Sequence, residues 1–195
     1  MRTRVLKVLI FIAGLVPAGS LIVGAFTDNL GANPIEFITH ETGTFALAFL
    51  IATLAVTPIR RVSRWHEIIR VRRMLGLFAF FYASLHLLTW VVLDQFFDAP
   101  AMIEDIAMRP YITVGMFGYV CLVPLAVTST AAMMRRLGSR WQTLHRLTYV
   151  AAVAGVIHFW WLVKADLTEP QRWAAVLTVL LAFRAWWAFR RRRYG

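Results

Sequence analysis

The chain is poor in cysteine and in acidic residues. Among its 195 residues it has one cysteine, Cys121, and ten acids against 21 lysines and arginines. Disulfides, iron–sulfur clusters and thiolate zinc sites all need more than one cysteine, and c-type haem needs the sequence C-x-x-C-H, which is absent. Cys121 is therefore expected to be a packing residue that faces lipid or the protein core.

Motifs of hydrolytic enzymes are missing as well. The sequence contains no H-E-x-x-H, no phosphate-binding loop and no Ser–His–Asp arrangement that spacing would suggest. Hydrolytic function is therefore poorly supported. No internal repeat is apparent.

Apolar residues, by contrast, are abundant. They make up 59% of the chain, and the mean hydropathy is +0.64, whereas soluble domains have about 45–50% apolar residues. A bilayer core needs about 20 apolar residues for each helical crossing. Six windows approach that length: 8–26, 38–58, 74–93, 111–134, 142–163 and 173–189. We predict an all-α fold, a bundle of six transmembrane helices that forms one domain over 1–195, with no separate soluble domain.

The positions of the charges predict the orientation of this bundle. With both termini inside and six crossings, 18 of the 21 basic residues and one of the ten acids, Glu67, lie on the inner side. Basic residues in short loops favour the cytoplasmic side. We therefore expect both termini in the cytoplasm, with the first apolar window retained because it exceeds a signal-peptide core.

The net charge of +11 is thus mostly explained by topology, and nucleic-acid binding is not expected. The basic loop 60–73 and the tail Arg190–Arg193 could also hold anionic membrane lipids or a flavin phosphate. Pro58 directly precedes this loop, so the second helix is expected to end there.

Two of the five histidines lie inside apolar windows at matching depth. His86 is eight residues before Asp94, about 12 Å below the outer end of its helix, and His158 is six residues before Lys164, about 9 Å below. Ionisable residues within a span are costly and are functional candidates. Two imidazoles at one depth on different helices can bind one metal from opposite sides, which suits haem inside a helical bundle. The alternative is a hydrogen bond between helices.

His145 lies deeper, about 20 Å from His158 along the chain and near the cytoplasmic face. The two would point about 140° apart on an ideal helix, so they share a face only if the helix is distorted. The position in line with His86, fourteen residues earlier, is Arg72 rather than histidine. The residues leave two alternatives: one haem, or an inner haem that uses His145 with an unusual second ligand. His66 and His40 are expected to be interfacial.

Several segments carry a family resemblance. The strings are HETGTFAL (40–47), TPIRR (57–61), RRMLGLFAFFYASLHL (72–87), RPYITVG (109–115), LAVTST (125–130), WQTLHRLTY (141–149) and IHFWW (157–161). Together they resemble the MsrQ family, haem-binding membrane subunits of bacterial periplasmic methionine sulfoxide reductase systems, within the ferric-reductase-like transmembrane superfamily.

This resemblance implies a function. Such proteins bind b-type haem (heme b), have been associated with FMN, and pass electrons across the inner membrane to a periplasmic molybdopterin-containing methionine sulfoxide reductase that repairs oxidised envelope proteins. The family's haem ligands fall on His86, His145 and His158, and Arg72 departs from the two-histidine pattern of related oxidases. The chain has no flavin or nicotinamide domain, so the donor would be a cytoplasmic flavin reductase or a membrane quinol.

Other functions remain open. The chain could be another haem-based reductase subunit, and as an electron-transfer subunit it shows no substrate site of its own. A transporter would need intramembrane acids, which the last four windows lack away from their ends. A non-catalytic membrane anchor would bind no chromophore.

Overall fold

The computed structural model describes residues 2–194, with the side chains at 2, 3, 191, 192 and 194 left out, and every regular element in that range is helical. Parts of the basic tail, at Arg191 and Arg192, therefore lie outside the described side chains. The elements follow in the order α1 (Arg2–Phe26), α2 (Pro34–Ser63), the 3₁₀ helix η1 (His66–Val71), α3 (Arg72–Leu88), the π-helix η2 (Thr89–Asp94), α4 (Ala99–Met108), α5 (Pro110–Val127), α6 (Ala131–Leu137), α7 (Ser139–Leu144), α8 (Leu147–Leu162) and α9 (Thr168–Tyr194).

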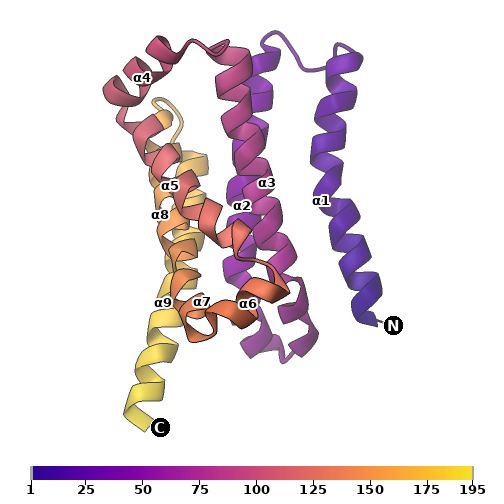
Figure 1. Cartoon of the computed structure of the whole chain (residues 1–195), viewed down its shortest axis with the longest axis vertical. Coiled ribbons are helices and arrows are strands. Elements are labelled where there is room, and N and C mark those ends of the chain that lie inside the picture. Colours follow the sequence, from indigo (N-terminus) through magenta and orange to yellow (C-terminus); the bar gives the residue numbers. More distant parts are fainter. Residues whose placement is uncertain (1, 195) are drawn as a thin grey trace.

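The long helices run up and down in a bundle (Figure 1). Both chain ends, η1 and the short helices α6 and α7 lie at one end of the bundle, and α4 lies at the other. We call these the terminal end and the α4 end. The predicted all-helical architecture is confirmed for the described residues.

Within residues 2–194, five helical segments are long and apolar enough to cross a membrane, one fewer than the six predicted. They are Arg4–Phe26, Pro34–Ser63, His66–Asp94, Pro110–Val127 and Thr168–Arg190. The remaining long helix, α8, has 16 residues and packs along α5. The predicted window 111–134 is interrupted after Val127, and 142–163 is interrupted at His145 and Arg146, so both of these spans are shorter than expected.

The core lies where α2, α3, α5 and α8 meet. Its buried members include Leu54, Ala79, Cys121 and Ala152, of which Leu54, Ala79 and Ala152 are fully inaccessible. Cys121 is a buried free thiol, as expected for a packing residue. Small residues permit the close approach of α5 and α8: a Cβ on Gly118 would lie 3.3 Å from the Ala154 Cβ. Close helix contacts through small residues are typical of membrane bundles.

The expectation that Pro58 ends the second helix is wrong. Helix α2 continues through Pro58 to Ser63 and ends at Arg64, which has a left-handed backbone (φ 57°). Proline cannot donate to the carbonyl four residues earlier, that of Leu54. Arg184 Nη2 of α9 donates to this oxygen instead, at 2.6 Å. A neighbouring helix thus supplies the missing partner, as membrane bundles often do.

A similar device joins α1 to the bundle. Tyr82 of α3 places its hydroxyl between Ala18 N and Gly14 O, accepting from the former at 3.1 Å and donating to the latter at 2.7 Å. These two atoms would otherwise bond each other within α1, near its internal Pro17. The Tyr82 side chain is fully buried and couples a proline-containing segment of α1 to the core.

Candidate functional site

The rings of His86 and His158 face each other across the bundle. His86 is in the last turn of α3 and His158 is in α8. Their ring centroids are 6.0 Å apart with an interplanar angle of 79°. The structure brings these two side chains together, although they are 72 positions apart in the sequence.

Each of these rings is oriented by a backbone carbonyl from a different helix. His86 Nδ1 lies 2.9 Å from Thr39 O in α2, and His158 Nδ1 lies 2.7 Å from Tyr111 O in the first turn of α5. A carbonyl oxygen only accepts, so in each neutral imidazole the proton is assigned to Nδ1. Nε2 then carries a lone pair and is free to bind a metal. Metal-binding histidines are commonly oriented in this way.

The two halves of the site repeat each other. Thr39 and Tyr111, Gly43 and Gly115, and His86 and His158 are three pairs, and in each pair the second residue lies 72 positions after the first. Each half therefore contributes a carbonyl, a glycine one helical turn later, and a histidine 47 residues after the carbonyl. We expected no internal repeat, and these contacts reveal a short one. The matching strings T-x-x-x-G-x-F and Y-x-x-x-G-x-F, at 39–45 and 111–117, were its signal in the sequence.

The ring separation fits two ligands of one metal ion. With a metal–nitrogen bond of about 2.0 Å and about 1.1 Å from nitrogen to ring centre, imidazoles on opposite sides of one ion have centroids about 6 Å apart. Across residues 2–194, no three His, Cys, Asp or Glu side chains gather to form a metal site made by protein alone. Two imidazoles with no third protein ligand suit a metal whose other positions come from a macrocycle, so the residues present fit haem.

His145 is separate from this pair. It lies in the turn between α7 and α8, with Nδ1 3.0 Å from Trp141 O and its ring stacked on the Trp141 indole at 3.7 Å. Its Nε2 is buried and has no hydrogen-bond partner. The helix is interrupted by a turn at His145 and Arg146. Such a distortion is the condition under which His145 and His158 could share a face.

Two arginines also lie toward the terminal end. Arg72, at the start of α3, is close enough to His145 and Arg184 for its charge to act on both. Arg184 bonds Leu54 O and the Tyr149 hydroxyl, the latter at 2.7 Å, while its Nε is buried without a partner. Sequence reasoning assigned Arg184 only to the charge pattern. An arginine inside an apolar window was the signal in the sequence that it had another role.

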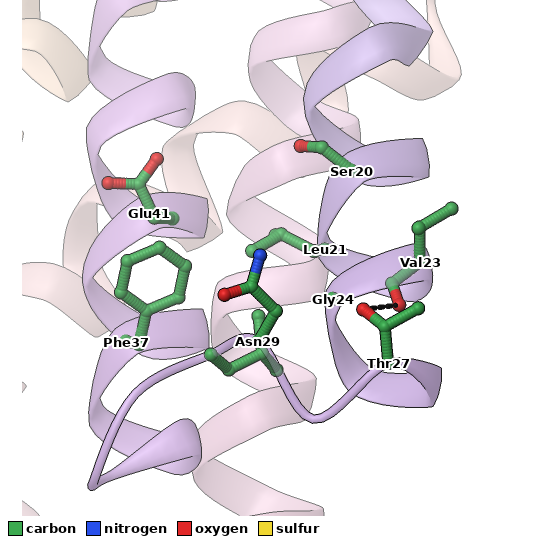
Figure 2. Close-up of a pocket in the computed structure, with 9 residues that line it drawn as sticks. Ser20, Leu21, Val23, Gly24, Thr27, Asn29, Phe37 and Glu41 are labelled. Carbon is green, nitrogen blue, oxygen red and sulfur yellow. Dashed lines mark hydrogen bonds between the residues drawn. The ribbon is translucent and has the colours of Figure 1, made fainter.

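The remaining histidines are exposed. His66 lies in η1, and His40 lies in α2 with Nδ1 4.0 Å from Glu41 Oε1. Glu41 also lines a cavity of about 370 Å³ between α1 and α2, together with Ser20, Asn29 and Phe37 (Figure 2). None of the residues that line this cavity belongs to the paired-histidine site.

Comparisons with known proteins show the family to which this sequence is similar. The model of the family described as "Ferric reductase like transmembrane component" matches residues 42–156, which include His86 and His145 and end two residues before His158. Three relatives bear the name "protein-methionine-sulfoxide reductase heme-binding subunit MsrQ". That of Herminiimonas arsenicoxydans is 52% identical over 96% of this chain and 87% of its own, that of Ralstonia nicotianae 50% over 98% and 90%, and that of Rhodospirillum rubrum 53% over 100% and 94%.

Proposed function

The chain belongs to the ferric reductase-like transmembrane family and, within it, to the MsrQ subunits, and we propose that it is the haem b-binding membrane subunit of a protein-methionine-sulfoxide reductase system. The observation that carries this proposal is the pair His86 and His158. Their rings are 6.0 Å apart, and each has Nδ1 engaged by a carbonyl so that Nε2 is free.

In this proposal Nε2 of His86 and Nε2 of His158 would hold the haem iron. Haem supplies a one-electron carrier when it is bound. The protein would contribute the rest: α2 and α5 fix the ring orientations through Thr39 O and Tyr111 O, and Phe159, the residue after His158, packs against the apolar core. Hydrogen bonds to Nδ1–H raise the basicity of the ligand, which favours the oxidised metal and lowers its potential.

The bundle is proposed to cross the inner membrane six times, with the terminal end in the cytoplasm. Helix α8 is about 24 Å long at 1.5 Å per residue, and the turn at His145 and Arg146 extends it toward the full core thickness. The basic segments that gather at the terminal end agree with this side. His86 and His158 then lie in the periplasmic half, close to α4.

The partner is proposed to be a periplasmic molybdopterin-containing methionine sulfoxide reductase, and the donor a cytoplasmic flavin reductase or a membrane quinol. Acidic residues on the α4 end, including Asp94, Asp98 and Glu104, would face that partner. Because the paired histidines lie toward this end, electrons leaving them have the shorter distance to the periplasm.

A second redox site at the terminal end is proposed around His145 and Arg72. The buried, unpartnered Nε2 of His145 supports a ligand there. The positive charge of Arg72 is proposed to balance a carboxylate on the redox group that binds at this second site. The FMN prediction rests on the family resemblance alone, and flavin fluorescence after acid extraction of the purified protein tests it.

The test of the haem proposal is a visible spectrum of the detergent-purified protein with His86→Ala and His158→Ala beside it. We expect a reducible b-type spectrum in the wild type and loss of the low-spin bis-histidine signal in each variant. A matched control is His66→Ala, an exposed histidine that should leave the spectrum unchanged. Near-full low-spin haem in either paired-histidine variant rejects the proposal.

The same spectrum separates the other functions. A transporter or a non-catalytic anchor predicts a well-folded, colourless protein. Another haem-based reductase subunit predicts the same spectrum but no electron delivery to a methionine sulfoxide reductase.

A further inference from the structure

We propose that Gly43 and Gly115 are positioning residues for the paired histidines: each leaves the space that its imidazole needs to reach the iron with Nδ1 on its carbonyl. The inference rests on the proposed haem function and goes beyond it, because it assigns a role to two residues that bear no ligand atom.

The contact distances carry the argument. A Cβ built on Gly115 would lie 2.7 Å from His158 Nδ1 and 3.0 Å from its Cε1. A Cβ on Gly43 would lie 3.0 Å from His86 Cε1 and 3.1 Å from its Nδ1. Carbon atoms pack at about 3.5–4.0 Å. An alanine at either position therefore has to displace the imidazole, and the displacement is larger at Gly115.

The backbone does not require glycine at these positions. Positive φ among the described glycines occurs at Gly31 and Gly138, not at Gly43 or Gly115, which lie inside α2 and α5. In a helix interior glycine is less favourable than alanine. Helix stability alone would therefore favour alanine, so the reason for glycine has to be the space beside the ring.

The displaced atom is the one that orients the ring. Nδ1 of His158 is both the nearest atom to the added Cβ and the donor to Tyr111 O at 2.7 Å. Moving it lengthens this hydrogen bond and turns Nε2 away from its present direction. At Gly43 the nearest ring atom is His86 Cε1, at 3.0 Å, and Nδ1, which donates to Thr39 O, follows at 3.1 Å, so the same kind of hydrogen bond is disturbed.

The arrangement occurs twice. Gly43 follows Thr39 by one helical turn, and Gly115 follows Tyr111 by one helical turn, so each glycine lies on the same helix face as the carbonyl that holds the ring. Two independent helices thus present the same pair of features to the two rings.

The experiment compares Gly115→Ala and Gly43→Ala with two matched glycine-to-alanine controls. A Cβ on Gly76, in the same helix as His86, would have Thr53 at 3.8 Å, and one on Gly19 would have no atom within 4 Å. The readouts are the haem-to-protein ratio after extraction, the low-spin signal of the oxidised protein, its midpoint potential, and helix content by circular dichroism.

We expect Gly115→Ala to retain haem about 10- to 100-fold less tightly, as found for changes in outer-shell partners of metal ligands. Gly43→Ala should have a smaller effect in the same direction, with a shifted low-spin signal. Both controls should match the wild type, and helix content should be unchanged in all four variants.

Chemical rescue gives a second test that removes the steric conflict. In His158→Gly, free imidazole should enter the vacated space and restore low-spin haem. In the double variant His158→Gly and Gly115→Ala, the added methyl group fills part of that space, and imidazole should no longer restore the signal. This comparison remains decisive if Gly115→Ala alone does not fold.

The outcomes separate the inference from the function on which it rests. If Gly43→Ala and Gly115→Ala keep wild-type haem, signal and potential while His86→Ala and His158→Ala lose them, the glycine inference is wrong and the haem proposal stands. Equal rescue of the single and double variants by imidazole would also overturn the inference. If the histidine variants themselves keep full low-spin haem, the proposed function has failed.

Discussion

Arg184 donates from Nη2 to the carbonyl oxygen of Leu54, the oxygen that Pro58 leaves without a partner inside α2. The same guanidinium donates from Nη1 to the Tyr149 hydroxyl in α8. One side chain of α9 therefore joins the two core helices α2 and α8.

Arg184→Gln is expected to destabilise the protein by about 1–3 kcal/mol, because a buried carbonyl loses a charged donor. Pro58→Ala restores a helical N–H to Leu54 O, so the cost of Arg184→Gln should shrink in that background. A double-mutant cycle on denaturation in detergent measures this coupling. Arg190→Gln, on the same helix but exposed, is the control. Additive effects at positions 58 and 184 would show that Arg184 does not compensate for the hydrogen bond that Pro58 removes.

Tyr82→Phe removes the hydroxyl that links α3 to α1. We expect the free energy of unfolding to fall by about 0.5–1.5 kcal/mol. The loss is small because Ala18 N can then donate to Gly14 O within α1. The haem spectrum should not change, since Tyr82 contacts neither paired histidine in the described structure. Thermal denaturation followed by circular dichroism measures the loss, and a variant as stable as the wild type would mean that α1 is held by apolar contacts alone.

His145→Ala tests the inner site separately from the outer one. We expect extracted haem to fall from two groups per chain to one, with the low-spin signal of the outer pair intact. If the low-spin signal of the outer pair is lost together with the inner haem, the two sites are not separate. With one haem in both proteins and equal reduction rates, His145 would be structural.

The orientation of the protein in the membrane can be tested by cysteine labelling, because the chain has one native cysteine, Cys121, which can be removed. In a Cys121→Ala background, new cysteines at the exposed positions Ala99 and Ala165 should react with an impermeant maleimide in intact cells. Cysteines at Ser63 and Ser139, exposed at the opposite end, should react only after lysis. Reaction of Ser63→Cys in intact cells would reverse the orientation predicted from the arginines.

The positions of the histidines show how far sequence reasoning reaches. Counting residues from Asp94 and Lys164 placed His86 and His158 at similar depth, because helical rise is nearly constant. It could not place the rings on facing sides, since facing depends on how α3 and α8 rotate against α2 and α5. The sequence did not predict that the carbonyl groups of Thr39 and Tyr111 bond the two histidines, because every residue type has a backbone carbonyl.

Pro58 shows the reverse case, in which a local rule failed. Proline inside a helix removes one hydrogen bond, and from neighbouring residues alone the helix should end there. The compensating donor, Arg184, lies 130 residues away from Leu54. Only the packing of α9 against α2 makes the continued helix favourable.

By itself, the amino-acid sequence determined that this protein is a helical membrane bundle. It also determined which membrane orientation the charges favour and which imidazoles lie at a similar depth. These properties follow from composition, period and local charge. The tertiary structure decided which side chains meet: the 6.0 Å approach of His86 and His158, the carbonyls that orient them and the glycines that make room. Such contacts join residues 43 to 72 positions apart, so they depend on helix rotation and packing, which no local pattern encodes.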